Sequence, residues 1–104
     1  MLRTEWNTSA WERAINKYKA ALNHWKSSGQ PREQAKTLLA IGNTYRALNE
    51  NQRSVSSYSE ALTLARRAKD RPLQLEILNA LGGIYCSLFD SKRCLMYGLK
   101  ALTL

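Results

Sequence analysis

The chain has 104 residues, and sixteen Lys and Arg against eight Asp and Glu give it a formal net charge of +8. This length provides one modest hydrophobic core, and no apolar run approaches the ~20 residues of a membrane helix. The charge favours anionic partners, and without an apolar leader at the N-terminus a cytoplasmic location is the default expectation.

The first predicted helix spans residues 9–27. Ser9 and Glu12 have the spacing of a capping box, which predicts that the helix begins there. Its apolar residues recur at spacings of three and four, which predicts one core-facing stripe. The stripe consists of Trp11, Ala14, Ile15, Tyr18, Ala21, Leu22 and Trp25. Trp6 precedes this helix and is expected to staple it or to cover an exposed end.

Four further helices are predicted near 31–48, 52–69, 72–88 and 91–104. Gly29 follows the end of the first helix and Pro31 opens the second, a common pairing at helix ends. Pro72 opens the fourth helix in the same way. Residues 49–51 and 89–91 form short turns, and connections this short make neighbouring helices antiparallel. No segment alternates like a strand, so the predicted fold class is all-α.

An internal repeat relates the two halves of the chain. Shifting the sequence by forty positions aligns Leu38–Tyr45 with Leu78–Tyr85, and Ala61–Leu64 with Ala101–Leu104. The same shift aligns Tyr58 with Tyr18. A repeat of this length predicts a solenoid of stacked helical hairpins.

These residues resemble the tetratricopeptide repeat pattern. The pattern is carried by Leu38-x-x-Ile41-Gly42-x-x-Tyr45 with Tyr58 and Ala61, and by Leu78-x-x-Leu81-Gly82-x-x-Tyr85 with Cys94 and Ala101. The resemblance implies a right-handed helical-hairpin solenoid in one domain, 1–104. It divides the chain into a partial repeat (9–29), a full repeat (30–69) and a nearly full repeat (70–104). Gly42 and Gly82 are expected to let two helices approach closely.

The sequence departs from the family pattern in three ways. The period is forty residues where the pattern has thirty-four, Arg66 replaces the terminal proline, and Gly98 replaces a large aromatic residue. Gly98 is expected to weaken the last repeat unless Tyr97 fills its place. The period is similar to that of the forty-residue variant found in bacterial multidomain proteins and animal cell-polarity adaptors.

The resemblance implies a protein-interaction scaffold that binds a partner peptide or helix in a concave groove. One stripe on the first helix of each hairpin would line the groove, and its residues are Lys36, Leu39, Asn43, Arg46, Glu76, Asn79, Gly83 and Cys86. They would offer cations for an acidic peptide, amides for its backbone and Leu39 as an apolar contact. Ala40 and Ala80 replace the polar clamp of chaperone-binding members. An ordinary solvated helix face is the alternative interpretation.

The sequence contains no pattern for catalysis, a cofactor or a metal, so we expect no enzyme activity. Gly82-Gly83 lies inside a helix pattern without a phosphate-loop lysine, and His24 sits near a helix end. Cys86 and Cys94 are expected to be thiols, with Cys94 in the core and Cys86 exposed. They could form a disulfide only if their helices face each other.

Two further expectations concern charge and the chain ends. The alternative function is binding of nucleic acid or an anionic surface through the basic outer face around Arg66 and Arg67, although no basic stripe with interleaved aromatics supports it. Trp11 and Trp25 are expected in the core and not in base stacking. Because repeat arrays need polar caps, the apolar ends predict an excised piece that can associate with another copy. No membrane insertion is expected.

Overall fold

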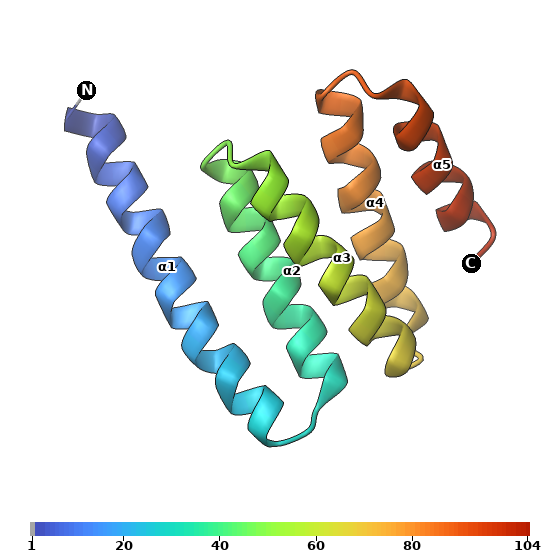
Figure 1. Cartoon of the computed structure of the whole chain (residues 1–104), viewed down its shortest axis with the longest axis horizontal. Helices are drawn as coiled ribbons and strands as arrows, with labels where there is room; N and C mark the ends of the chain where they lie inside the picture. Colours follow the sequence, from blue (N-terminus) through green and yellow to red (C-terminus); the bar gives the residue numbers. More distant parts are fainter. Residues whose placement is uncertain (1) are drawn as a thin grey trace.

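The computed structural model describes the backbone of residues 2–104 and the side chains of residues 9–104. These residues form five helices and no strand, which confirms the all-α prediction. The helices are α1 (Leu2–Ser27), α2 (Pro31–Ala47), α3 (Asn51–Arg67), α4 (Arg71–Ser87) and α5 (Ser91–Leu102). Consecutive helices run antiparallel and stack in chain order, with the two termini at opposite ends (Figure 1). The fold is a helical-repeat solenoid.

The predicted start of the first helix is wrong. α1 begins at Leu2, so Ser9 and Glu12 lie inside the helix and form no capping box. The backbone of Trp6 belongs to α1 and does not precede it, and its side chain lies outside the described residues. Because neither Gly nor Pro occurs between residues 2 and 10, nothing in the local sequence stops the helix from continuing. The other helix boundaries agree with the prediction to within two residues.

One turn geometry closes all four connections. Gly29, Asn49, Lys69 and Phe89 adopt left-handed conformations with φ of 65°, 64°, 56° and 60°, at intervals of twenty residues. At each turn the amide of the next residue donates to a carbonyl in the preceding helix, as in Gln30 N to Trp25 O at 3.1 Å. These are Schellman C-caps. Of the four left-handed residues, the sequence indicated only Gly29 as one.

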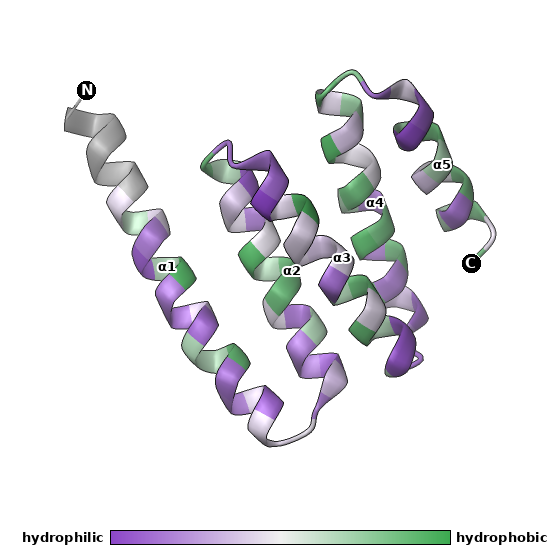
Figure 2. Cartoon of the chain, in the orientation of Figure 1, coloured by the Kyte–Doolittle hydropathy of each residue, from purple (hydrophilic) through white to green (hydrophobic). Residues whose placement is uncertain are grey.

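The core lies mainly in the three central helices. The buried apolar side chains are Ile15, Leu22, Ala35, Leu38, Leu39, Ile41, Tyr45, Tyr58, Ala61, Leu62, Leu64, Ala65, Leu73, Ile77, Leu78, Leu81 and Ile84. Figure 2 shows these apolar positions along α2, α3 and α4, and a further apolar stretch on α5. No residue of α5 is buried.

Trp11 does not pack in the core as predicted. It is 42% exposed, and Tyr18 on the same stripe is 37% exposed. Among the described residues, α1 packs against α2 alone, and the side of α1 that this contact covers carries Ile15 and Leu22. A second neighbour would be needed to cover the whole stripe. Trp25 is half-buried.

A tyrosine packed on a glycine joins the helices of the full repeat. The ring of Tyr58 is fully buried against Gly42, where an added Cβ would lie 2.6 Å from the ring. Ser54 Oγ donates to the carbonyl of Gly42 at 2.8 Å. The expected close approach at Gly42 is therefore confirmed.

The last hairpin is joined differently, and two predictions about it are wrong. A Cβ added at Gly82 would meet no atom closer than Tyr97 Cβ at 3.5 Å, so this glycine is not required by a close approach. Cys94 occupies the position of Ser54 and forms a disulfide with Cys86, so neither is a free thiol. The Cα atoms are 5.1 Å apart because α4 and α5 face each other at this point.

Tyr97 partly replaces the missing aromatic residue. Its ring stacks on Tyr85 of α4, with the ring centroids 5.6 Å apart and the planes within 2° of parallel. Burial raises the pKa of Tyr97 above its ordinary value, and the neighbouring Tyr85 phenol raises it further. The ring covers the end of α4 but does not lie over Gly82, where Gly98 leaves space.

Candidate functional site

The predicted groove residues lie on α2 and α4, which contact each other across the full repeat. At one end of this contact, the Arg46 guanidinium lies over Gly83, and a Cβ added there would be 3.2 Å from Nη2. At the other end, Arg32 Nε pairs with Asp70 Oδ2 at 3.1 Å. The structure therefore brings Arg46 and Gly83 together, and two arginines join the helices along this surface.

Four of the predicted residues are exposed between these two contacts. Lys36 forms a weak pair with Glu33 at 3.8 Å. Asn43 accepts the Tyr58 hydroxyl proton through Oδ1, which leaves its NH2 group free to donate. Glu76 and Asn79 are exposed and make no side-chain hydrogen bond or ion pair to another described residue. All four thus keep polar groups available to a ligand.

Two predicted groove residues are placed differently from the expectation. Leu39 was expected to offer an exposed apolar contact, but it is 7% exposed and belongs to the core. α2 contacts α1, α3 and α4, so a wider arc of this helix is covered than one packing partner would cover. Cys86 is exposed but is bonded to Cys94. The exposed part of the surface is therefore polar and charged.

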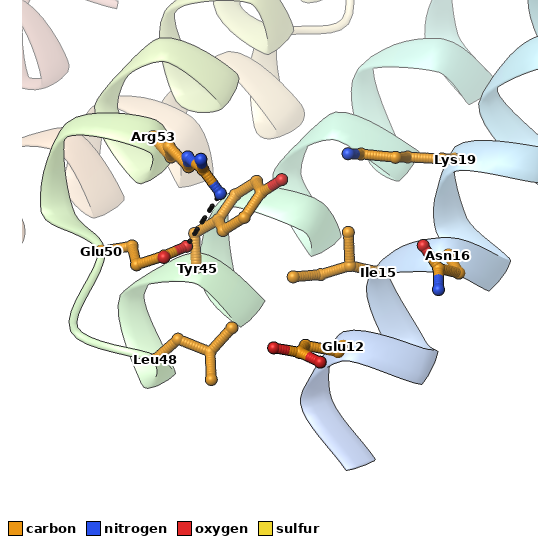
Figure 3. Close-up of a pocket in the computed structure, with 8 residues that line it drawn as sticks. All are labelled: Glu12, Ile15, Asn16, Lys19, Tyr45, Leu48, Glu50 and Arg53. Carbon is orange, nitrogen blue, oxygen red and sulfur yellow. Dashed lines mark hydrogen bonds and ion pairs between the residues drawn. The ribbon is translucent and has the colours of Figure 1, made fainter. Parts of the chain in front are cut away.

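A second hollow, which the sequence did not indicate, lies between α1 and the junction of α2 with α3 (Figure 3). It encloses about 380 Å³ and is lined by Glu12, Ile15, Asn16, Lys19, Tyr45, Leu48, Glu50 and Arg53. The sequence could not predict this hollow, because helix periodicity does not reveal which residues of different helices lie next to each other.

The charged groups of this hollow belong partly to the hairpin structure. The Arg53 guanidinium lies 5.7 Å from the centroid of the Tyr45 ring and pairs with Glu50 at 3.5 Å. The same arrangement recurs in the next hairpin, where Arg93 lies 5.5 Å from the Tyr85 centroid and pairs with Asp90 at 3.0 Å. A cation over an aromatic face stabilises modestly. This repeated cluster closes each hairpin and does not by itself indicate a ligand.

The comparisons with known proteins agree with the hairpin architecture. A family model described as "Tetratricopeptide repeat" matches residues 33–104. The chain belongs to the tetratricopeptide repeat family. The match covers most of α2 and all of α3, α4 and α5, which the structure shows as two antiparallel helix pairs.

A solved tetratricopeptide-like structure has the same fold. The crystal structure of BtubC (BKLC) from P. vanneervenii superposes with a TM-score of 0.80 at 22% sequence identity. The similarity covers 91% of this chain and 39% of that chain, so the chain spans well under half of the solved protein. At this identity the likeness concerns the fold alone. No curated protein matches the chain.

The described residues of this tetratricopeptide chain contain no group of three or more His, Cys, Asp or Glu side chains that could hold a metal. They also contain no helix long and apolar enough to cross a membrane. His24 is exposed in the last turn of α1. Its ring centroid lies 4.8 Å from that of Trp25, in an edge-to-face arrangement.

Proposed function

We propose that this chain is a protein-interaction scaffold that binds an extended peptide of a partner protein along the exposed surface of α2 and α4. Tetratricopeptide repeats generally mediate contacts between proteins and are typically non-catalytic. The observation that carries the proposal is the exposed amide group of Asn79 and the partly free amide of Asn43, on two helices that contact each other.

The chemistry of this surface suits an extended acidic segment. The side-chain amides can pair with backbone N–H and C=O groups, because an amide both donates and accepts. Lys36 and Arg46 favour carboxylates in the ligand, whereas Glu76 selects against a uniformly acidic one. The start points of α2 and α4, forty residues apart, support a place in the forty-residue-period variant of the family.

The proposal is tested by titrating ¹⁵N-labelled protein with a capped, extended peptide of alternating Glu and Asn residues. We expect the largest amide shifts on the exposed stripe of α2 and α4. Asn43→Asp keeps the acceptor for Tyr58, removes the donor and adds a charge that repels the acidic peptide, and Asn79→Ala removes the other amide. Each should weaken binding up to about tenfold, because a hydrogen bond contributes a net ~0.5–1.5 kcal/mol.

The matched control is Asn23→Ala, which removes an exposed asparagine from α1. It should leave the affinity unchanged. If Asn43→Asp and Asn79→Ala behave like the control while the protein stays folded, the peptide does not bind through these amides and the proposal is wrong.

A second candidate function is the binding of an anionic polymer near the junction of α3 and α4. One observation favours it: Arg66, Lys69 and Arg71 line a hollow of about 380 Å³ together with Gln74, Thr103 and Leu104. None of these three cations forms an ion pair with a described acidic residue. Basic residues at a helix C-terminus also have a structural explanation, since they interact favourably with the helix dipole.

Salt dependence separates the two candidates. Binding of a fluorescent single-stranded oligonucleotide through phosphates should weaken steeply and linearly on a log–log plot of affinity against salt. Arg66→Ala should then reduce both the affinity and the slope. A complete lack of oligonucleotide binding at low salt would contradict the anionic-polymer function. It would not affect the proposal of peptide binding on α2 and α4.

A further inference from the structure

α5 differs in surface character from α1 and α3, its counterparts in the forty-residue repeat. The forty-residue shift aligns residues 11–22 of α1 with residues 51–62 of α3 and residues 91–102 of α5. Met96 aligns with Asn16 and Ser56, and Leu99 aligns with Lys19 and Ser59. All of these positions are exposed. At two exposed positions, therefore, α5 carries apolar side chains where its counterparts are polar.

Helix stacking does not explain the apolar character of Met96 and Leu99. The stacking positions are occupied by Ile15 and Leu22 in α1, which are buried by α2. Positions Asn16 and Lys19 stay exposed although α2 packs beside them, and Ser56 and Ser59 stay exposed although α4 packs beside α3. A further repeat packed on α5 in the same manner would cover Leu95 and Leu102, which align with Ile15 and Leu22. It would leave Met96 and Leu99 exposed.

α5 also carries a lysine at two positions where one of its two counterparts carries an acid. Lys92 stands where α1 has Glu12, and Lys100 stands where α3 has Glu60. From Ser91 to Leu102 the helix contains no acidic residue. The two lysines lie at either end of the apolar residues.

Together these residues line one shallow hollow of about 410 Å³. We call it the α5 patch, and it is lined by Lys92, Leu95, Met96, Leu99, Lys100 and Thr103. Leu95 is 64% exposed, Leu99 52% and Met96 40%. Figure 2 shows the apolar stretch on α5, on a helix at the edge of the array. The patch is thus apolar in the middle and positive at both ends.

We propose that the α5 patch binds an amphipathic helix of a partner protein, with leucine-like side chains on one face and Asp or Glu beside them. The hollow accepts apolar side chains of such a helix, and the thioether of Met96 adapts to their shape. Carboxylates on the partner would meet Lys92 and Lys100, which fixes its position along α5. This surface is separate from the exposed stripe of α2 and α4.

The charges of the patch disfavour a second copy of this chain as the occupant. In a symmetric contact between two copies, the same patch would face itself, which brings lysines against lysines. A membrane surface would also attract the lysines, and the vesicle measurement below distinguishes it from a helix.

The test uses the whole chain and a fluorescein-labelled helical peptide with a leucine stripe at positions i, i+4 and i+7 flanked by glutamates. A second peptide has the same stripe flanked by lysines. Fluorescence anisotropy should show at least tenfold tighter binding of the glutamate peptide. Met96→Ser combined with Leu99→Ser should weaken binding of the glutamate peptide at least tenfold, because α3 has serine at both of the aligned positions.

Two further variants make the assignment specific. Lys92→Glu with Lys100→Glu should reverse the preference, so that the lysine peptide binds more tightly. Leu75→Ser, which removes an exposed leucine from α4, should leave binding unchanged. Circular dichroism of each variant should match that of the parent chain, because all substituted residues are exposed.

Three outcomes would overturn the proposal. Glutamate-peptide binding that the Met96→Ser, Leu99→Ser variant retains would place the contact elsewhere. Binding to phosphatidylserine vesicles that this variant loses, without peptide binding, would assign the patch to a membrane surface. A concentration-dependent dimer in light scattering that the variant abolishes, without peptide binding, would assign it to a second copy.

Discussion

At the scale of single residues, Gly42 and Gly82 occupy equivalent positions but do different things. Gly42 provides the space for the Tyr58 ring, which is fully buried. Gly82 faces Tyr97 Cβ and the Cys94 carbonyl at ordinary contact distances, because the equivalent of Tyr58 is Gly98. Equal spacing in the sequence therefore does not mean equal packing.

The two glycines should respond oppositely to alanine. In Gly42→Ala the new methyl would lie 2.6 Å from the buried ring, so overpacking should lower the free energy of unfolding by about 1–3 kcal/mol. In Gly82→Ala the methyl fits, and the helix propensity of alanine should raise the free energy of unfolding by up to ~1 kcal/mol. Urea unfolding followed by circular dichroism measures both. Equal losses in the two variants would contradict this account.

At the scale of elements, the four helix turns share one geometry but not one residue type. Gly29 suits a left-handed φ because it has no Cβ, and asparagine at position 49 tolerates it. Lys69 and Phe89 adopt it only because the Schellman hydrogen bonds and the packed helices on both sides hold them there. These two residues therefore carry local backbone strain.

Phe89→Gly should stabilise the chain. The ring is 93% exposed and leaves little packing to lose, whereas the left-handed conformation costs a non-glycine residue roughly 1–2 kcal/mol. The greater freedom of glycine in the unfolded chain offsets part of this gain, so we expect a net increase of about 0.5–1 kcal/mol in urea unfolding. Gly29→Ala, at the equivalent turn, should show a loss. A loss in both variants would mean that Phe89 contributes contacts of its own.

The Cys86–Cys94 bond compensates for a weakly buried helix. α5 has no buried residue, no tyrosine on glycine and no counterpart of the Ser54 hydrogen bond. Reduction should lower the free energy of unfolding by about 2–4 kcal/mol, the usual range for a disulfide. Urea unfolding with and without dithiothreitol measures this, with Cys94→Ser as the permanently reduced counterpart. Two thiols that react with a maleimide in the unreduced native protein would show that the bond is absent.

At the scale of the whole molecule, the chain is a stack in which most contacts join neighbouring helices. In the part that the structure describes, α2–α4 is the one further pair. Such stacks have stabilities that depend on each unit and its neighbours. The buried residues concentrate in α2, α3 and α4, while α1 contributes Ile15 and Leu22. Stability should therefore fall from the centre of the stack towards its ends.

Hydrogen exchange should reveal this gradient. Amides of α2, α3 and α4 should exchange slowest, and those of α5 and of residues 9–14 of α1 should exchange fastest, because local opening there breaks few buried contacts. Mass spectrometry of peptic fragments measures the rates, and reduction of Cys86–Cys94 should accelerate α5 more than α2. Uniform protection along the chain would indicate one cooperative unit instead.

The sequence by itself determined the fold class, the positions of four of the five helices and the repeat. This was possible because the apolar period, the glycines and the prolines act within a few residues. It also predicted that Asn43 and Arg46 share one stripe of their helix and that Asn79 lies on the equivalent stripe of a later helix, because side-chain direction along a helix depends on spacing.

The tertiary structure alone decided how much of each stripe is covered. Leu39 is buried because α2 has three neighbouring helices, and Trp11 is exposed because α1 has one. Cys86 meets Cys94, and Gly82 has room for a methyl group, because of how α5 lies against α4. The amphipathic period reveals which arc of a helix is apolar, whereas burial depends on how many helices approach it and from which sides.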